Sequence, residues 1–61
     1  MPEIIVYAVE GRSAETKKAL MADITAAVVK NFAVPAENVV VQIVESPRDS
    51  KSRGGIPFSE R

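Results

Sequence analysis

The chain opens with an apolar stretch whose side chains favour a strand. Residues 2–9 are rich in β-branched and aromatic side chains, a composition typical of strands. Strand alternation gives this stretch two apolar faces: Ile4, Val6 and Ala8 on one, and Ile5, Tyr7 and Val9 on the other. Because both faces are apolar, we expect both to be buried. The strand is predicted to end at Glu10-Gly11-Arg12, where glycine permits a tight turn.

The hydropathy pattern then changes to a helical period. Ser13 is the predicted N-cap, and Glu15 in the first turn complements the positive end of the helix dipole. From Ala14 to Asn31, helical spacing collects one stripe of mostly apolar side chains: Leu20, Ile24, Ala27, Val28 and Asn31. The helix is expected to stop near Phe32, because Val34 precedes a proline and therefore disfavours helical backbone.

A second strand and a polar segment follow the helix. Pro35 to Asn38 predicts a turn, and Val39 to Glu45 predicts a strand that is apolar on both faces apart from Gln42. Two strands joined by one helix indicate a right-handed β-α-β unit with parallel strands. Residues 46–55 are polar and rich in turn formers, which predicts a hairpin or an ordered loop, and residues 56–58 are expected to be an apolar docking tail.

These elements predict a single domain, residues 1–61, of the α/β (α+β) class: a β-α-β protomer with a short C-terminal hairpin. A chain of this length buries only about 60% of its unfolded surface, and it has no cysteine for disulfides. One helix covers one face of a two-stranded sheet and leaves the apolar side chains of the other face exposed to solvent. Burying each such side chain is worth roughly 1.5–3 kcal/mol. We therefore predict a homo-oligomer.

Charge and composition limit the classes of partner that we expect. Eight basic and eight acidic residues give no net charge, which argues against nucleic acid as a partner. No apolar run approaches the roughly 20 residues of a membrane span, and the N-terminus lacks the basic leader of a secretory signal. We expect a cytoplasmic protein that does not bind membranes. Histidine and cysteine are absent, so the commonest metal ligands and the commonest general base are missing.

Pro2 is the best candidate for a base in this composition. Methionine aminopeptidases generally remove Met1 when proline follows, which leaves a secondary amine on a rigid ring. A free α-amino group has a pKa of about 8, and an apolar pocket or a nearby cation lowers that pKa. A neutral amine near pH 7 can act as a general base. The plain alternative is a proline at the start of an edge strand, where its missing N–H costs nothing.

Arg12 is the second candidate. A guanidinium at a strand end can bind a carboxylate through two hydrogen bonds, and it can lower the pKa of a neighbouring amine. A solvated arginine in a turn is the alternative interpretation of the same position.

The chain resembles the 4-oxalocrotonate tautomerase family over essentially its whole length. Pro2, the first strand, Glu10-Gly11-Arg12-Ser13 and the amphipathic helix resemble the N-terminal half of that family. A second strand ending in Glu45, then Gly54-Gly55-Ile56-Pro57 at the same spacing, resembles its C-terminal half. The resemblance implies β-α-β subunits that pair their sheets into dimers. It favours a hexamer built from such dimers, with a dimer as the alternative.

The resemblance also implies an activity. The N-terminal proline, here Pro2, would transfer a proton between the enol and keto forms of a small 2-oxo acid, without metal or organic cofactor. Arg12 would bind the carboxylate of this small-molecule substrate. Val9 and Asn38 correspond to positions that line the pocket, and Asn38 would come from a neighbouring subunit.

Two positions depart from the family pattern. Where the best-known members carry a second arginine this chain has Val40, and where they usually place an aromatic residue it has Lys51. Either Lys51 or Arg53 supplies the missing cation, or the substrate has only one carboxylate. A solvated hairpin face is the alternative for both side chains.

Two other functions fit the same sequence. One is a dehalogenase- or decarboxylase-type activity of the same superfamily, in which a protonated proline works with a carboxylate, Glu3 or Glu10, that activates water. The other is a non-catalytic subunit of an oligomer, which Val40 and Lys51 would favour.

Overall fold

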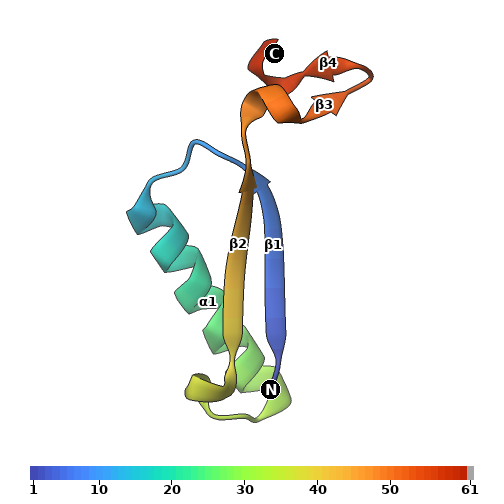
Figure 1. Cartoon of the computed structure of the whole chain (residues 1–61). Coiled ribbons are helices and arrows are strands. Elements are labelled where there is room, and N and C mark those ends of the chain that lie inside the picture. The colour runs from blue at the N-terminus through green and yellow to red at the C-terminus, as the bar shows by residue number, and fades with distance from the viewer. Residues whose placement is uncertain (61) are drawn as a thin grey trace.

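The computed structural model describes residues 1–60. Strand β1 (Glu3–Val9) and strand β2 (Val40–Ser46) form a parallel two-stranded sheet, as predicted. β1 starts one residue later than expected, and β2 is shifted by one residue at both ends. The register pairs Glu3 with Val40 and Val9 with Ser46, so the strands match over their whole length. Both strands start at one end of the sheet and finish at the other (Figure 1).

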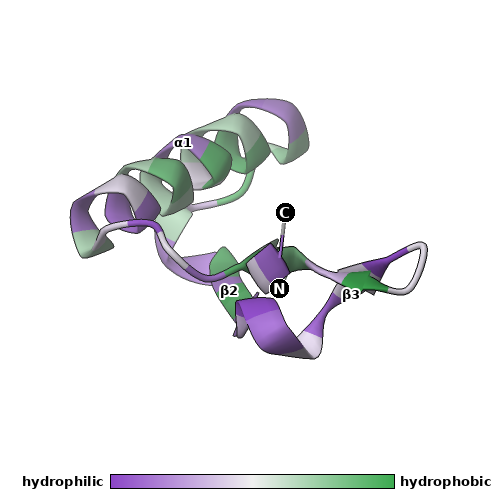
Figure 2. Cartoon of the chain, turned by 90° about the horizontal axis from the view of Figure 1, so that it is seen from above, coloured by the Kyte–Doolittle hydropathy of each residue, from purple (hydrophilic) through white to green (hydrophobic). Residues whose placement is uncertain are grey.

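Helix α1 (Ala14–Phe32) connects the two strands and lies on one side of the sheet (Figures 1 and 2). The Ser13 side chain caps its start by accepting a hydrogen bond from the Thr16 N–H. Its end lies at Phe32, as predicted. There Ala33 adopts a left-handed conformation (φ 57°), and its N–H donates to the Val29 carbonyl oxygen.

The predicted apolar stripe of the helix is only partly confirmed. Ile24 and Val28 are half-buried, but Leu20, Ala27 and Asn31 are exposed. The half-buried positions are instead Lys17, Met21, Ile24, Thr25, Val28 and Val29. The helix packs mainly on β2, so the side that contacts the sheet is rotated from the side that hydropathy alone selects.

The C-terminal segment forms the predicted hairpin. Strands β3 (Ser52–Arg53) and β4 (Ile56–Pro57) pair antiparallel around Gly54-Gly55. Short 3₁₀ turns, η1 (Ala36–Asn38), η2 (Arg48–Ser50) and η3 (Phe58–Glu60), join or flank the strands. The expected docking tail at residues 56–58 was wrong for Ile56 and Pro57. They form the second arm of the hairpin because the two glycines, both at positive φ, reverse the chain immediately before them.

The isolated protomer has no interior. No residue among 1–60 is fully buried, and on the side of the sheet away from α1 Tyr7 is 73% exposed and Ile5 46% exposed. The radius of gyration is 14.6 Å. A compact chain of this length would have a radius of gyration of about 10–11 Å. No helix in residues 1–60 is long and apolar enough to cross a membrane.

Candidate functional site

Pro2 lies at the end of the sheet where both strands begin. It immediately precedes β1 and is half-buried, and its carbonyl oxygen accepts a hydrogen bond from the Val40 N–H at 3.0 Å. This bond fixes the backbone of Pro2 to the first residue of β2. Val40 is 37% exposed, and Asn38 ends the exposed turn η1 two residues before it. The structure therefore places Pro2, Val40 and Asn38 at one end of the protomer.

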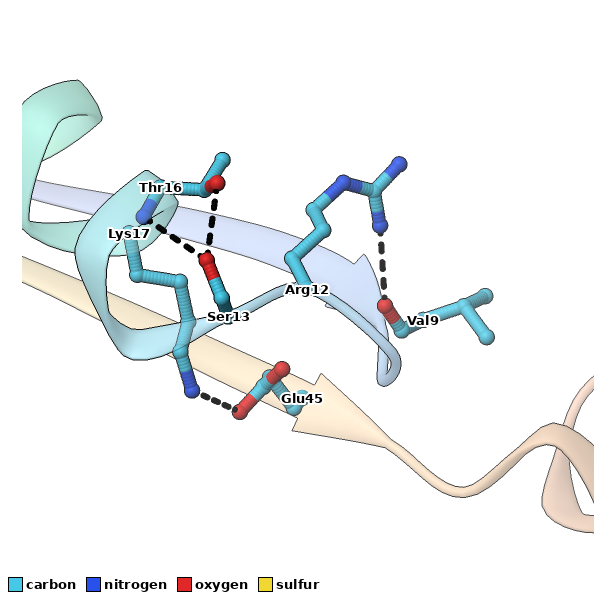
Figure 3. A network of polar contacts seen from close by, with 6 residues as sticks. All are labelled: Val9, Arg12, Ser13, Thr16, Lys17 and Glu45. Atoms are coloured by element: carbon cyan, nitrogen blue, oxygen red, sulfur yellow. Dashed lines mark hydrogen bonds and ion pairs between the residues drawn. The ribbon is translucent and has the colours of Figure 1, made fainter.

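Arg12 lies at the opposite end of the same strand. Its Nη1 donates to the Val9 carbonyl oxygen at 3.0 Å, which folds the guanidinium back over the last residue of β1 (Figure 3). The turn between them is held to β2 by the Glu10 N–H, which donates to the Ser46 carbonyl oxygen at 2.9 Å. A guanidinium has five N–H donors, and Arg12 uses one of them here. The remaining donors can bind a carboxylate.

The two candidate groups are therefore separated within one protomer. The seven residues of β1 span about 20 Å at the usual rise of a strand, and Pro2 and Arg12 lie beyond its two ends. Val9 accompanies Arg12, whereas Asn38 and Val40 accompany Pro2. One chain does not bring the candidate base and the candidate carboxylate-binding residue together.

Lys51 and Arg53 belong to the hairpin beyond the carboxyl ends of β1 and β2 (Figure 1). Lys51 is half-buried, and its carbonyl oxygen accepts a hydrogen bond from the Phe58 N–H at 2.8 Å. The Arg53 guanidinium lies 6.0 Å from the centroid of the Phe58 ring. Both residues are thus on the Arg12 side of the molecule, at the end of the sheet away from Val40.

Arg48 is a cation that the sequence analysis did not single out. Its guanidinium lies beside Gly11, and a Cβ placed on that glycine would be 3.5 Å from its Nη2. The strand register explains this contact. Val9 is paired with Ser46 at the ends of the strands, and two residues beyond that pair Gly11 lies beside Arg48. The sequence pattern predicted parallel strands but no register, so it gave no signal for this contact.

The side of the sheet facing α1 contains a pocket of about 240 Å³. Apolar side chains of β1, β2 and α1 line most of it, together with Arg12, Thr16, Lys17 and Glu45. Lys17 Nζ and Glu45 Oε1 form an ion pair at 2.8 Å, which ties α1 to β2 near the end where the strands finish (Figure 3). Residues 1–60 contain no group of three or more acidic side chains placed to hold a metal ion.

Comparison with known proteins gives a consistent result. The family model described as "Tautomerase enzyme" matches residues 2–61. A probable tautomerase of Bradyrhizobium diazoefficiens is 52% identical over 61 residues, covering 100% of this chain and 91% of the relative. The 2-hydroxymuconate tautomerase of Comamonas testosteroni is 37% identical over 60 residues, covering 98% and 95% respectively.

Solved structures agree with these relatives. A heterohexamer 4-oxalocrotonate tautomerase from Chloroflexus aurantiacus superposes with a TM-score of 0.88 at 35% identity, covering 98% of this chain and 97% of the other. A 4-oxalocrotonate tautomerase homologue superposes with a TM-score of 0.93 at 33% identity, covering 100% and 97%. The resemblance noted in the sequence is therefore confirmed in both sequence and fold.

Proposed function

Because this chain belongs to the tautomerase family, we propose that it interconverts the enol and keto forms of a small 2-oxo acid, with Pro2 as general base. The proposal requires removal of Met1, since the Pro2 nitrogen is an amide while Met1 precedes it. Met1 is 87% exposed, so its peptide bond to Pro2 is accessible to an aminopeptidase.

The position of Pro2 is the observation that supports this proposal most. Its carbonyl oxygen is hydrogen-bonded to the Val40 N–H, so the ring is held at the start of the sheet after Met1 is lost. Removal of Met1 would leave a rigid secondary amine at this position, and an apolar pocket completed by neighbouring copies would favour the neutral form that accepts a proton. The amine would take the proton of the enol hydroxyl and deliver it to carbon as the keto form appears. In the reverse direction it would take the proton from that carbon and return it to oxygen, so the reaction needs no further reagent.

The separation of Pro2 from Arg12 supports a site built between copies of the chain. In the two-stranded sheet, β1 and β2 each have one unpaired edge, and the face carrying Ile5 and Tyr7 is open. If two copies pair through β1 in antiparallel fashion, the start of one strand meets the finish of the other. A two-fold axis would then bring Pro2 of each copy to Arg12 of the other, forming two equivalent sites. Edge pairing leaves the face carrying Ile5 and Tyr7 uncovered, so stacking such dimers through this open face into a larger homo-oligomer would bury it.

The test is a spectrophotometric ketonisation assay on 2-hydroxymuconate and phenylenolpyruvate, using protein whose free N-terminal proline has been confirmed by mass. Pro2→Ala should lower kcat/KM by at least about a hundredfold, the usual contribution of a general base. Pro35→Ala, which changes a proline in the turn before η1, is the matched control and should keep its activity. Equal activity of Pro2→Ala and the unaltered protein would refute the mechanism.

A non-catalytic subunit of a mixed oligomer is a second candidate. Val40 favours it, because an apolar residue stands where the best-known family members have an arginine. The structural relative from Chloroflexus aurantiacus is itself a heterohexamer. If the protein expressed alone assembles normally and has a free Pro2, yet turns over neither enol, this second function replaces the first.

A further inference from the structure

We infer that Arg48 is a specificity-determining residue that joins Arg12 in binding the substrate carboxylate. The inference rests on the proposed function, because it assigns a further residue to the same site. It accounts for a cation whose position the family pattern does not explain.

Both guanidinium groups lie against the same short turn. Arg12 contacts it at Val9, where its Nη1 donates to the carbonyl oxygen at 3.0 Å. Arg48 contacts it at Gly11, with Nη2 at 3.5 Å and Nε at 3.9 Å from the position of a Cβ there. Gly11 has a φ of 129°, and both distances are ordinary van der Waals contacts, so the Arg48 guanidinium lies directly beside the turn. The two cations therefore approach the end of β1 from different elements, one from β1's own turn and one from η2.

Neither cation is neutralised within the protomer. The one salt bridge found among residues 1–60 joins Lys17 to Glu45, and no hydrogen bond or ion pair engages the Arg48 guanidinium there. Glu10 and Asp49 are the nearest acids in sequence. Asp49 accepts a hydrogen bond from the Ser50 hydroxyl at 3.3 Å, and Glu10 forms no ion pair.

Two positive groups at one turn repel each other, and an anion bound between them relieves that repulsion. A carboxylate can accept hydrogen bonds from two guanidinium groups through its two oxygens. This arrangement concentrates the cationic groups at the Arg12 end of the sheet, whereas the Pro2 end carries Val40. Arg48 thus strengthens the carboxylate-binding end in a chain that lacks a cation at position 40.

The experiment compares Arg48→Gln with Lys30→Gln, which removes the same charge from the last turn of α1 at the far end of the molecule. On phenylenolpyruvate, Arg48→Gln should raise KM by about tenfold and leave kcat within about twofold, because a ground-state contact to the carboxylate is lost. Lys30→Gln should change neither. Unchanged KM in Arg48→Gln would overturn the inference while leaving the proposed tautomerase activity intact.

Direct binding makes the test independent of turnover. The dissociation constants of trans-cinnamate and its methyl ester are measured by titration calorimetry. Arg48→Gln should raise the dissociation constant of cinnamate by about tenfold and leave that of the uncharged ester unchanged. A merely structural defect would raise both dissociation constants equally. In an Arg12→Gln background, the further loss from Arg48→Gln should be smaller, because both residues bind the same carboxylate. Equal losses on acid and ester, or no cinnamate binding by the unaltered protein, would overturn the inference.

Discussion

At the scale of single residues, Gly11 connects the backbone of the turn to the charged groups around it. Its φ of 129° lies in a region that L side chains rarely adopt, and the Arg48 guanidinium lies 3.5 Å from where a Cβ would be. Pro2 and Arg12 are equally dependent on backbone contacts, the first through the Val40 N–H and the second through the Val9 carbonyl oxygen. The candidate site is therefore positioned by main-chain hydrogen bonds at the strand ends.

Gly11→Ala should destabilise the protein by about 1–3 kcal/mol, because alanine at this φ is strained. For a chain of this size, each kcal/mol corresponds to roughly 4–8 °C in Tm, which calorimetry resolves. Gly54→Asn is the matched control, since its φ of 62° suits asparagine and nothing lies within 4 Å of the added Cβ. An unchanged Tm for Gly11→Ala would show that the turn has another accessible conformation.

At the scale of elements, the start of α1 positions the segment that carries Arg12. Arg12 directly precedes the Ser13 cap, so the helix start and the candidate carboxylate-binding residue share one turn. The Ser13 hydroxyl oxygen accepts from the Thr16 N–H at 3.1 Å and lies 2.9 Å from the Thr16 hydroxyl, to which it donates. The Lys17–Glu45 ion pair then fastens the first turn of α1 to β2. Removing the N-cap hydrogen bond should therefore make the segment that carries Arg12 less well ordered.

Ser13→Ala should lower the free energy of unfolding by about 1 kcal/mol, the usual cost of losing an N-cap. Urea denaturation followed by circular dichroism measures this loss. Ser50→Ala removes another exposed serine hydroxyl, whose bond to Asp49 is 3.3 Å long, and should stay within about 0.5 kcal/mol. Ser13→Asp should restore most of the stability, because aspartate is an equally good cap. Equal effects at positions 13 and 50 would contradict the capping role.

At the scale of the whole molecule, residues 1–60 of the isolated protomer form no buried core. No residue among 1–60 is fully buried, and the extents of 42 × 22 × 13 Å describe a flat, elongated body. The strand register assigns Val6 and Ile43 to the side that faces α1, and Ile5 and Tyr7 to the open side. Association through the open side would supply the missing burial.

Tyr7→Asp should convert the proposed oligomer to smaller species, because it places a charge on the open face without altering contacts to α1. Size-exclusion chromatography with light scattering gives the mass. Ile43→Asp changes the face toward α1, so it should unfold the chain rather than separate folded copies. Ala36→Asp, on the exposed turn η1, is the control and should keep the native mass. An unaltered mass for Tyr7→Asp would show that the open face is not the interface.

Much of the fold could be predicted because it depends on local patterns. Strand alternation, the Ser13 cap and the proline after Val34 act within a few residues, and the strands, helix and hairpin were found close to their expected bounds. The helix side that packs on the sheet was only partly predicted. Hydropathy selected Ala27 and Asn31, which are exposed, whereas the approach of α1 to β2 half-buries Met21 and Thr25.

Residue type by itself pointed to Pro2 and Arg12 as candidates, because the chemistry of an amine and a guanidinium is a property of the residues themselves. The family was indicated by the resemblance of the chain to known members. Only the tertiary structure decided where these groups lie relative to one another. The parallel register puts Pro2 with Val40 at one end of β1, and it puts Arg12 with Arg48 at the other. Proximity between residues far apart in the chain depends on strand direction and register, which join segments that the sequence separates by more than thirty residues.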